Sequence, residues 1–147
     1  TDSPGGTTAS VNPATGEEVA TALLGDATTI VDAARAARAA QRAWAATPAP
    51  VRGQVVGRIG RLVEANADAL ARLVTREIGK PLAEARGEVQ EIVDTATFFA
   101  GEGRRLYGHT VPSEMPDKQL FTFRVPVGVA VVVTAGNFPV AVPSWYL

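Results

Sequence analysis

The chain reads PVGVAVVVTAGNFP at residues 126–139, and this stretch decides the expected fold. From Gly128 to Thr134 it shows no polar alternation, which is typical of a parallel β-strand that helices cover on both faces. It then reaches Asn137 and Pro139, and proline suits the first turn of a new helix. A buried strand, a loop and a helix in this order predict an α/β nucleotide-binding sheet.

Four helices are expected ahead of this strand, because apolar residues recur there at spacings of three and four. Capping residues, glycine and proline mark their ends. The second helix is expected to bury a face of Val51, Val55, Ile59, Leu62 and Val63. The first helix is expected to begin within Asp26–Thr29 and to run to about Thr47, and the second to begin at Pro50. The third is expected to begin at a capping Asn66 and to end at Gly79, and the fourth to run from Leu82 to about Leu106.

Two further segments are expected to be strands. The first segment, residues 8–24, is interrupted by turn residues and so predicts a strand, a turn and a second strand. The second segment, LFTFRV at 120–125, alternates apolar and polar residues. We expect both to project as an oligomerisation sheet, since a strand with an apolar face needs a partner. The expected organisation is a flexible lead-in (1–7), N-terminal strands and helices of a cofactor-binding domain (8–119), an oligomerisation strand (120–125), and the first strand, loop and helix start of the nucleotide-binding sheet (126–147).

Composition limits the function classes. The 147 residues carry 14 basic and 15 acidic side chains, a formal charge of −1, so we expect neither a nucleic-acid partner nor a polybasic membrane contact. The absence of cysteine excludes a disulfide, a thiolate metal site and a thiol nucleophile within these residues. No metal site is expected, and the expected location is cytoplasmic. The apolar end VPSWYL predicts that the chain is the amino-terminal part of a longer protein.

Asn137 has two interpretations. In an α/β sheet it would lie beyond the carboxyl end of a strand, where its neutral amide N–H could donate to a developing oxyanion. It could instead cap the helix that Pro139 begins, and its spacing alone favours the cap.

Four dispersed motifs resemble the aldehyde dehydrogenase superfamily in their order and spacing, and the likeness covers nearly the whole chain. They are NPATGE at 12–17, REIGKP at 76–81, PVGV at 126–129 and NFP at 137–139. A second set is similar to the α-aminoadipic semialdehyde (piperideine-6-carboxylate) dehydrogenase branch: PAPVRG at 48–53, GEVQEIVD at 87–94, PSE at 112–114 and TAGNFPVAV at 134–142.

The resemblance implies a mechanism in which a cysteine thiolate attacks an aldehyde, NAD or NADP takes a hydride, and a glutamate-activated water releases a carboxylate. It implies that Asn137 is the catalytic oxyanion donor. It implies that the backbone of Val133, Thr134, Ala135 and Gly136 lines the cofactor. Many members have proline and tryptophan where this chain has Ala135 and Gly136, so side-chain contacts with the cofactor are not expected there.

The resemblance also implies that the cysteine and the general base lie beyond Leu147, that this segment alone is inactive, and that the whole protein is a homo-oligomer, a dimer or a tetramer. A different class of protein, a non-catalytic helical assembly module, would account for the alanine-rich stripes and the missing thiol. It would not account for the likeness of TAGNFP to a catalytic loop.

Three residues are candidates for substrate binding. Glu91 matches a branch glutamate that faces the substrate tunnel, where it could pair with the α-ammonium of an amino-acid semialdehyde. Glu84, Glu88 and Glu91 could equally form a solvated acidic helix face. Phe138 and Trp145 match tunnel-wall positions of the family, and either could equally be a core residue.

Overall fold

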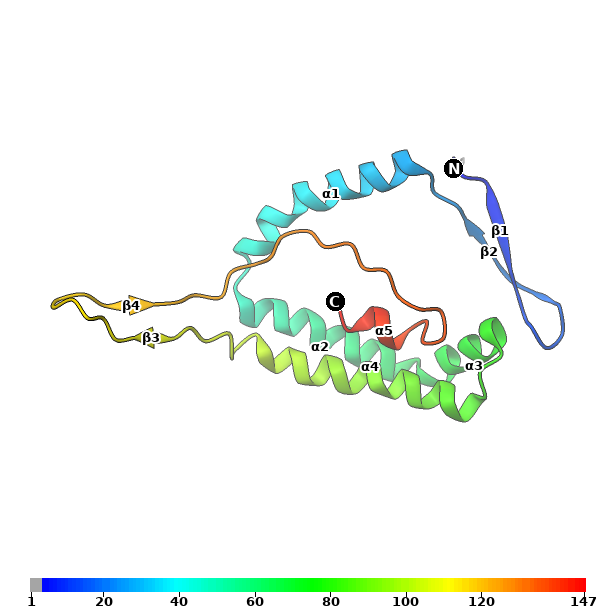
Figure 1. The fold of residues 1–147 in the computed structure, drawn as a ribbon. Coiled ribbons are helices and arrows are strands. Elements are labelled where there is room, and N and C mark those ends of the chain that lie inside the picture. Colours follow the sequence, from blue (N-terminus) through cyan, green and yellow to red (C-terminus); the bar gives the residue numbers. More distant parts are fainter. Residues whose placement is uncertain (1–3) are drawn as a thin grey trace.

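The computed structural model describes residues 4–147, and residues 1–3 of the expected lead-in lie outside the described residues. Helices α2 and α4 lie side by side, while the β3–β4 hairpin projects away from the helices (Figure 1). The elements are β1 (Thr7–Val11), β2 (Glu18–Leu23), α1 (Ala27–Ala46), α2 (Ala49–Ala65), α3 (Ala67–Ile78), α4 (Leu82–Glu102), β3 (Thr110–Val111), β4 (Leu120–Phe121) and α5 (Ala141–Ser144).

Local side-chain and backbone preferences set the helix ends. Asp26 caps α1: its Oδ1 accepts the backbone N–H of Thr29 at 2.8 Å, and the Thr29 hydroxyl accepts the backbone N–H of Asp26 at 3.2 Å. The backbone and side-chain hydrogen bonds from Thr29 hold the pKa of Asp26 below its ordinary value. Gly79 ends α3 in the left-handed conformation, with a φ of 74°. Both predicted helix ends are therefore confirmed.

Asn66 differs from its prediction. It occupies the N-cap position of α3, but its Nδ2 donates to the carbonyl of Leu62 at 2.7 Å, and its side chain makes no capping bond to the helix that follows within residues 4–147. The amide thus satisfies the last turn of α2 rather than the first turn of α3, and the predicted side-chain cap is wrong.

Helix α2 meets α4 through buried glycines as well as through half-buried aliphatic side chains, Val55, Ile59 and Val63. Gly53 and Gly60 are its buried residues, whereas Val51 and Leu62, which were expected in the buried face, are exposed. A Cβ at Gly53 would lie 2.5 Å from the carbonyl oxygen of Ala100. The two backbones approach too closely for a side chain at this crossing. The predicted face is therefore wrong at Val51 and Leu62, and it also includes the buried glycines Gly53 and Gly60.

This close approach gives a first prediction. We expect Gly53→Ala to lower the free energy of unfolding by about 1–3 kcal/mol, the usual effect of overpacking. The matched control is Gly87→Ala in α4, where a Cβ would meet nothing within 4 Å in residues 4–147. Because alanine is more favourable than glycine in a helix interior, the free energy of unfolding of the control should rise by about 0.5–1 kcal/mol. Urea unfolding of both variants checks the difference, and a Gly53→Ala protein as stable as the control would refute the close crossing.

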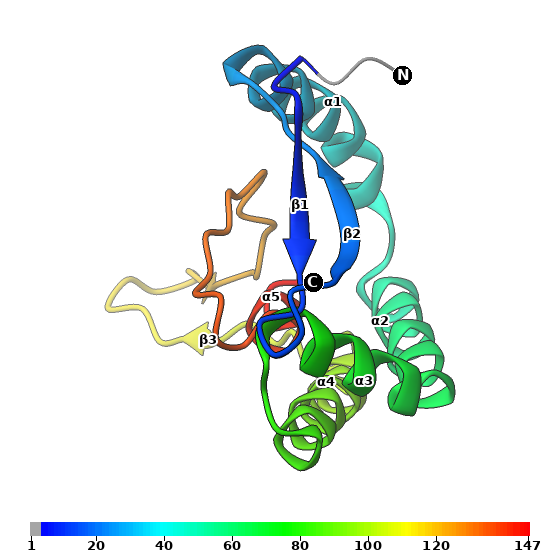
Figure 2. The same ribbon diagram turned by 90° about the vertical axis from the view of Figure 1, so that its right-hand side faces the viewer.

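The strands form two separate antiparallel hairpins, β1–β2 and β3–β4. Figure 1 and Figure 2 show them well apart, so the single projecting sheet expected from residues 8–24 and 120–125 is not what forms. The second strand is shorter than expected, since β4 covers only Leu120–Phe121. The first hairpin is longer, because Gly5 donates to the Leu24 carbonyl at 3.0 Å and Leu24 donates to the Gly6 carbonyl at 2.9 Å.

Residues 122–140 run back from the β3–β4 hairpin toward α5 (Figure 1). No strand pairs with the apolar run at 126–135 among the described residues 4–147. A strand is defined by its hydrogen bonds to a neighbouring strand, so the parallel strand expected here stays a prediction. The helix expected to open at Pro139 is the short α5, which begins two residues later.

The core lies where α3 meets α4. Its fully packed members are Ala71 and Val74 from α3 with Ala85 and Val89 from α4, and Val140 packs against them from the segment before α5. The segment before α5 therefore packs against α3 and α4. None of the helices within residues 4–147 has the length and apolar character needed to cross a membrane.

Candidate functional site

A buried carboxylate anchors the segment that follows the apolar run. Glu88 on α4 is only 2% exposed. Its Oε1 accepts the backbone N–H of Val140 at 2.9 Å and that of Ala141 at 3.1 Å, and its Oε2 accepts a bond from Lys80 Nζ at 2.6 Å. A buried carboxylate is costly unless it is paired and hydrogen-bonded, and Glu88 meets both conditions.

Lys80 binds the other end of the same segment, at Asn137. It lies between α3 and α4, and its side chain is 10% exposed. Besides Glu88, its Nζ donates to the backbone carbonyl of Asn137 at 2.6 Å and lies 3.9 Å from the ring centroid of Phe138. We call Lys80 and Glu88 the clamp. It holds the turn of residues 137–141 by backbone groups at both ends.

The charge of Glu88 is stabilised by its partners. Burial alone raises the pKa of the Glu88 carboxyl, but the hydrogen bonds from Lys80, Val140 and Ala141 and the charge of Lys80 outweigh burial, so that the pKa lies below its ordinary value. The clamp is therefore an ion pair at neutral pH.

Asn137 lies in an exposed turn between the apolar run and α5. The N-cap of α5 is Val140, and no side chain in the described chain caps that helix. The interpretation of Asn137 as a helix cap is therefore wrong. The Asn137 carbonyl is bound by Lys80, while its carboxamide has no hydrogen bond to another described residue, which leaves its N–H free to donate.

The four predicted cofactor residues lie directly before Asn137, where the chain is neither helix nor strand and Gly136 already belongs to the turn. Val133 is 91% exposed, Thr134 is half-buried, and Ala135 and Gly136 are exposed. A Cβ at Gly136 would meet nothing within 4 Å in the described residues, so its backbone can be approached closely. An accessible backbone with small side chains suits contact with a dinucleotide, and these residues fit the group they were predicted to line.

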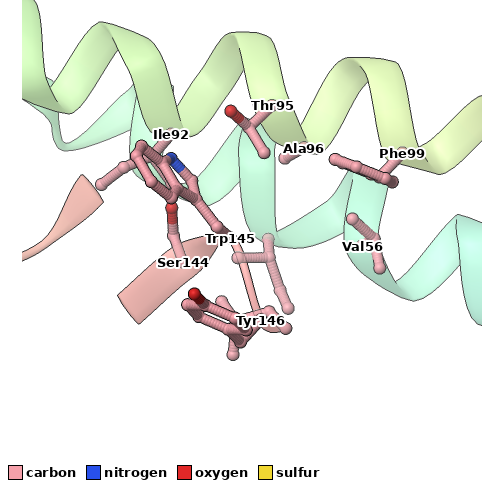
Figure 3. A pocket seen from close by; sticks show the side chains of 10 residues that line it. Val56, Ile92, Thr95, Ala96, Phe99, Ser144, Trp145 and Tyr146 are labelled. Carbon is pink, nitrogen blue, oxygen red and sulfur yellow. The ribbon is translucent and has the colours of Figure 1, made fainter. Parts of the chain in front are cut away.

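The predicted substrate residues do not gather in one place. Trp145 helps to line a cavity of about 220 Å³ between α2, α4 and the α5 end of the chain (Figure 3). Glu91 is half-buried on α4, and Phe138 lies under Lys80. In residues 4–147 neither of them lines this cavity, whose lining is Val56, Ile59, Ile92, Thr95, Ala96, Phe99, Ser144, Trp145, Tyr146 and Leu147.

Sequence reasoning missed both members of the clamp. Its one interpretation of Glu88 was as part of a solvated acidic face with Glu84 and Glu91, whereas Glu88 is buried. The signal was present, because Ala85, Glu88 and Ile92 follow one another at spacings of three and four along the buried stripe of α4. An acid within an apolar stripe requires a buried cation, and Lys80 supplies it. Across the described part of the chain, no three His, Asp or Glu side chains are arranged to hold a metal ion.

Comparisons with known proteins agree on one family. A sequence model described as "Aldehyde dehydrogenase family" matches residues 1–147. Aldehyde dehydrogenase family 7 member A1 of Pisum sativum is 42% identical over 96% of this chain and 28% of its own length. Alpha-aminoadipic semialdehyde dehydrogenase of Mus musculus is 45% identical over 74% of this chain and 20% of its own length.

Solved structures agree with this family, since an aldehyde dehydrogenase from Brucella melitensis biovar abortus 2308 superposes with a TM-score of 0.90 at 38% identity, covering 98% of this chain and 30% of that one. The crystal structure of an E. coli NADP dependent enzyme superposes with a TM-score of 0.90 at 37% identity, covering 94% of this chain and 29% of that one. The chain thus spans less than a third of the length of these relatives. The likeness confirms the α/β fold class expected from the sequence.

Proposed function

The chain belongs to the aldehyde dehydrogenase family, and on this premise we propose that the whole protein oxidises an amino-acid semialdehyde to a carboxylate with NAD or NADP. The semialdehyde class is supported by the mouse relative, whose name gives alpha-aminoadipic semialdehyde as its substrate. A nicotinamide cofactor is supported by the similar E. coli protein, which is described as an NADP dependent enzyme.

The single observation that carries the proposal is the state of Asn137. Its backbone carbonyl is fixed by Lys80, whereas its carboxamide makes no bond within the described residues. A fixed but uncommitted N–H is what oxyanion stabilisation requires, because the donor needs no reorganisation when charge develops. In the proposed mechanism, Asn137 donates to the oxygen of the aldehyde as a thiolate adds to its carbon.

Residues 133–136 are proposed to present their backbone to the dinucleotide. A nicotinamide held there would supply the hydride acceptor that oxidation of an aldehyde requires. The role of this segment is to hold the cofactor beside Asn137 without side chains that would obstruct it, and the open space at Gly136 supports that role.

The thiolate must come from elsewhere in the whole protein, because these 147 residues contain no cysteine. We therefore propose that the chain alone is inactive. The alternative of a non-catalytic helical assembly module does not account for the family match over residues 1–147.

A cytoplasmic location and a homo-oligomeric state, as a dimer or a tetramer, belong to the same proposal. The oligomer is supported by the projecting β3–β4 hairpin, since Phe121 beside Phe123 leaves apolar surface exposed.

Substrate choice gives a prediction that tests the proposed function. We expect Glu91→Gln in the whole protein to raise KM for α-aminoadipic semialdehyde about 10- to 100-fold, since a hydrogen bond to a charged group contributes roughly 1.5–3 kcal/mol. KM for an unsubstituted aliphatic aldehyde should change less than about twofold, because that substrate has no ammonium group to lose a partner. Steady-state rates, followed by the absorbance of the reduced nicotinamide, check both values.

The matched control is Glu84→Gln, an exposed acid on the same helix, which should leave both KM values unchanged. Equal effects of Glu91→Gln on the two substrates would remove Glu91 from substrate recognition. If the whole protein reduces neither NAD nor NADP with any aldehyde, the proposed function itself fails.

A further inference from the structure

The bonds of the clamp converge on one turn. Lys80 binds the carbonyl of Asn137 and covers the ring of Phe138, while Glu88 binds the N–H groups of Val140 and Ala141. Apart from their own ion pair, the polar contacts of the two side chains within the described residues all go to this five-residue segment. The clamp therefore fixes where the turn lies and which way it faces.

Stability alone does not account for such a pair. Replacing a buried ion pair by apolar residues of similar volume is often neutral or stabilising, so burial of charge is weak support for a stabilising role. Site geometry gives a better reason, since a shift of about 1 Å in a reacting group can cost 10²-fold in rate. A turn held at both ends by charge-assisted bonds, which are shorter and stronger than neutral ones, has little freedom to make that shift.

We propose that Lys80 and Glu88 are positioning residues, which set the carboxamide of Asn137 for the reaction by holding the backbone on both sides of it. This inference rests on the proposed role of Asn137 as oxyanion donor. Neither clamp residue needs to touch the substrate, since each acts through the turn.

A double-mutant cycle in the whole enzyme tests the proposal. Glu88→Gln keeps the size of the side chain but removes the charge that Lys80 binds. We expect it to lower kcat about 10-fold or more, with KM and the Kd of the dinucleotide changed less than about twofold. In an Asn137→Ala background the same substitution should have almost no further effect on kcat, because residues that act as a unit are not additive. A merely structural role would give the same loss in both backgrounds.

The control is Asp68→Asn. Asp68 pairs with Arg86 at 2.7 Å and so also joins α3 to α4, but at the exposed surface. It should leave kcat unchanged. Lys80→Arg, which keeps the charge but moves the donors, provides a second cycle with the same expected coupling if thermal melting shows that Glu88→Gln does not fold.

The outcomes separate the two proposals. Additive losses from Glu88→Gln and Asn137→Ala overturn the positioning role and leave the proposed function standing. An Asn137→Ala enzyme with unchanged turnover overturns the oxyanion role, and with it the positioning role of the clamp. A loss of kcat that vanishes in the Asn137→Ala background supports both.

Discussion

We expect Asn137→Ala to lower kcat of the whole enzyme about 10²- to 10³-fold, and the Kd of the dinucleotide to stay within about twofold. This size is expected for removal of one preorganised donor to an oxyanion, which corresponds to about 2.7–4 kcal/mol of transition-state stabilisation. Because Val140 is the N-cap of α5, the substitution removes no helix cap. Because Lys80 binds the backbone carbonyl of Asn137 and not its side chain, the clamp is also retained. Steady-state kinetics and a fluorescence titration with the dinucleotide measure the two quantities.

Asn66→Ala serves as the matched control for this prediction. It removes the same carboxamide from an exposed position between α2 and α3, far along the chain from the turn. Its thermal stability should fall, since a bond to Leu62 is lost, but its kcat should not change. Comparable losses of kcat in both variants would mean that Asn137 contributes to stability rather than to the reaction.

The second large effect is on stability. Lys80→Met leaves the Glu88 carboxylate buried with backbone N–H partners alone, and breaking a buried ion pair by removing one partner costs about 3–5 kcal/mol. We expect the midpoint of urea unfolding to fall accordingly. Lys118→Met makes the same replacement at an exposed lysine between β3 and β4, and should change the free energy of unfolding by less than about 0.5 kcal/mol. Equal midpoints for the two variants would show that the clamp contributes no stability.

The pH dependence of this stability has a definite sign. The folded pKa of Glu88 lies below its ordinary value, so the ion pair contributes its full stability at neutral pH, above the pKa of the carboxyl in the unfolded chain. That contribution is lost as the pH falls through the folded pKa. In Lys80→Met only burial and the backbone donors remain, and the pKa of Glu88 should rise. Urea midpoints of Lys80→Met should therefore begin to change at a higher pH than those of the unsubstituted protein.

The sequence predicted features that depend on neighbouring residues. The predicted helix start within Asp26–Thr29 and the predicted helix end at Gly79 are both found, because a capping box at Asp26 and a left-handed Gly79 require only short-range bonds. The fourth helix ends at Glu102 rather than near Leu106, at a boundary where Gly101 and Gly103 lower the helix propensity.

Features that depend on distant partners were missed. The buried glycines of α2 are required by α4, since a Cβ at Gly53 would meet the backbone of Ala100 and one at Gly60 the side chain of Ala96, and helix periodicity alone does not reveal these contacts. Glu88 was misplaced because it was grouped with the other acidic residues at helical spacing. Its position within the apolar stripe of α4 was not considered. Asn137 was favoured as a cap on spacing, yet the short α5 begins after Val140. For the glycines and for Glu88 the deciding contacts come from segments far along the chain, whereas for Asn137 the start of α5 decides.

The clamp lies far along the sequence from the turn that it holds, and this distance affects the order in which the chain folds. Lys80 and Glu88 flank the start of α4 and can meet as soon as α3 and α4 dock, whereas Asn137 and Val140 lie 57 and 52 residues away from them respectively. Closing so long a loop costs entropy that local helix contacts do not. The helices are therefore expected to assemble first, and the turn of residues 137–141 is expected to reach its final position only in a late step.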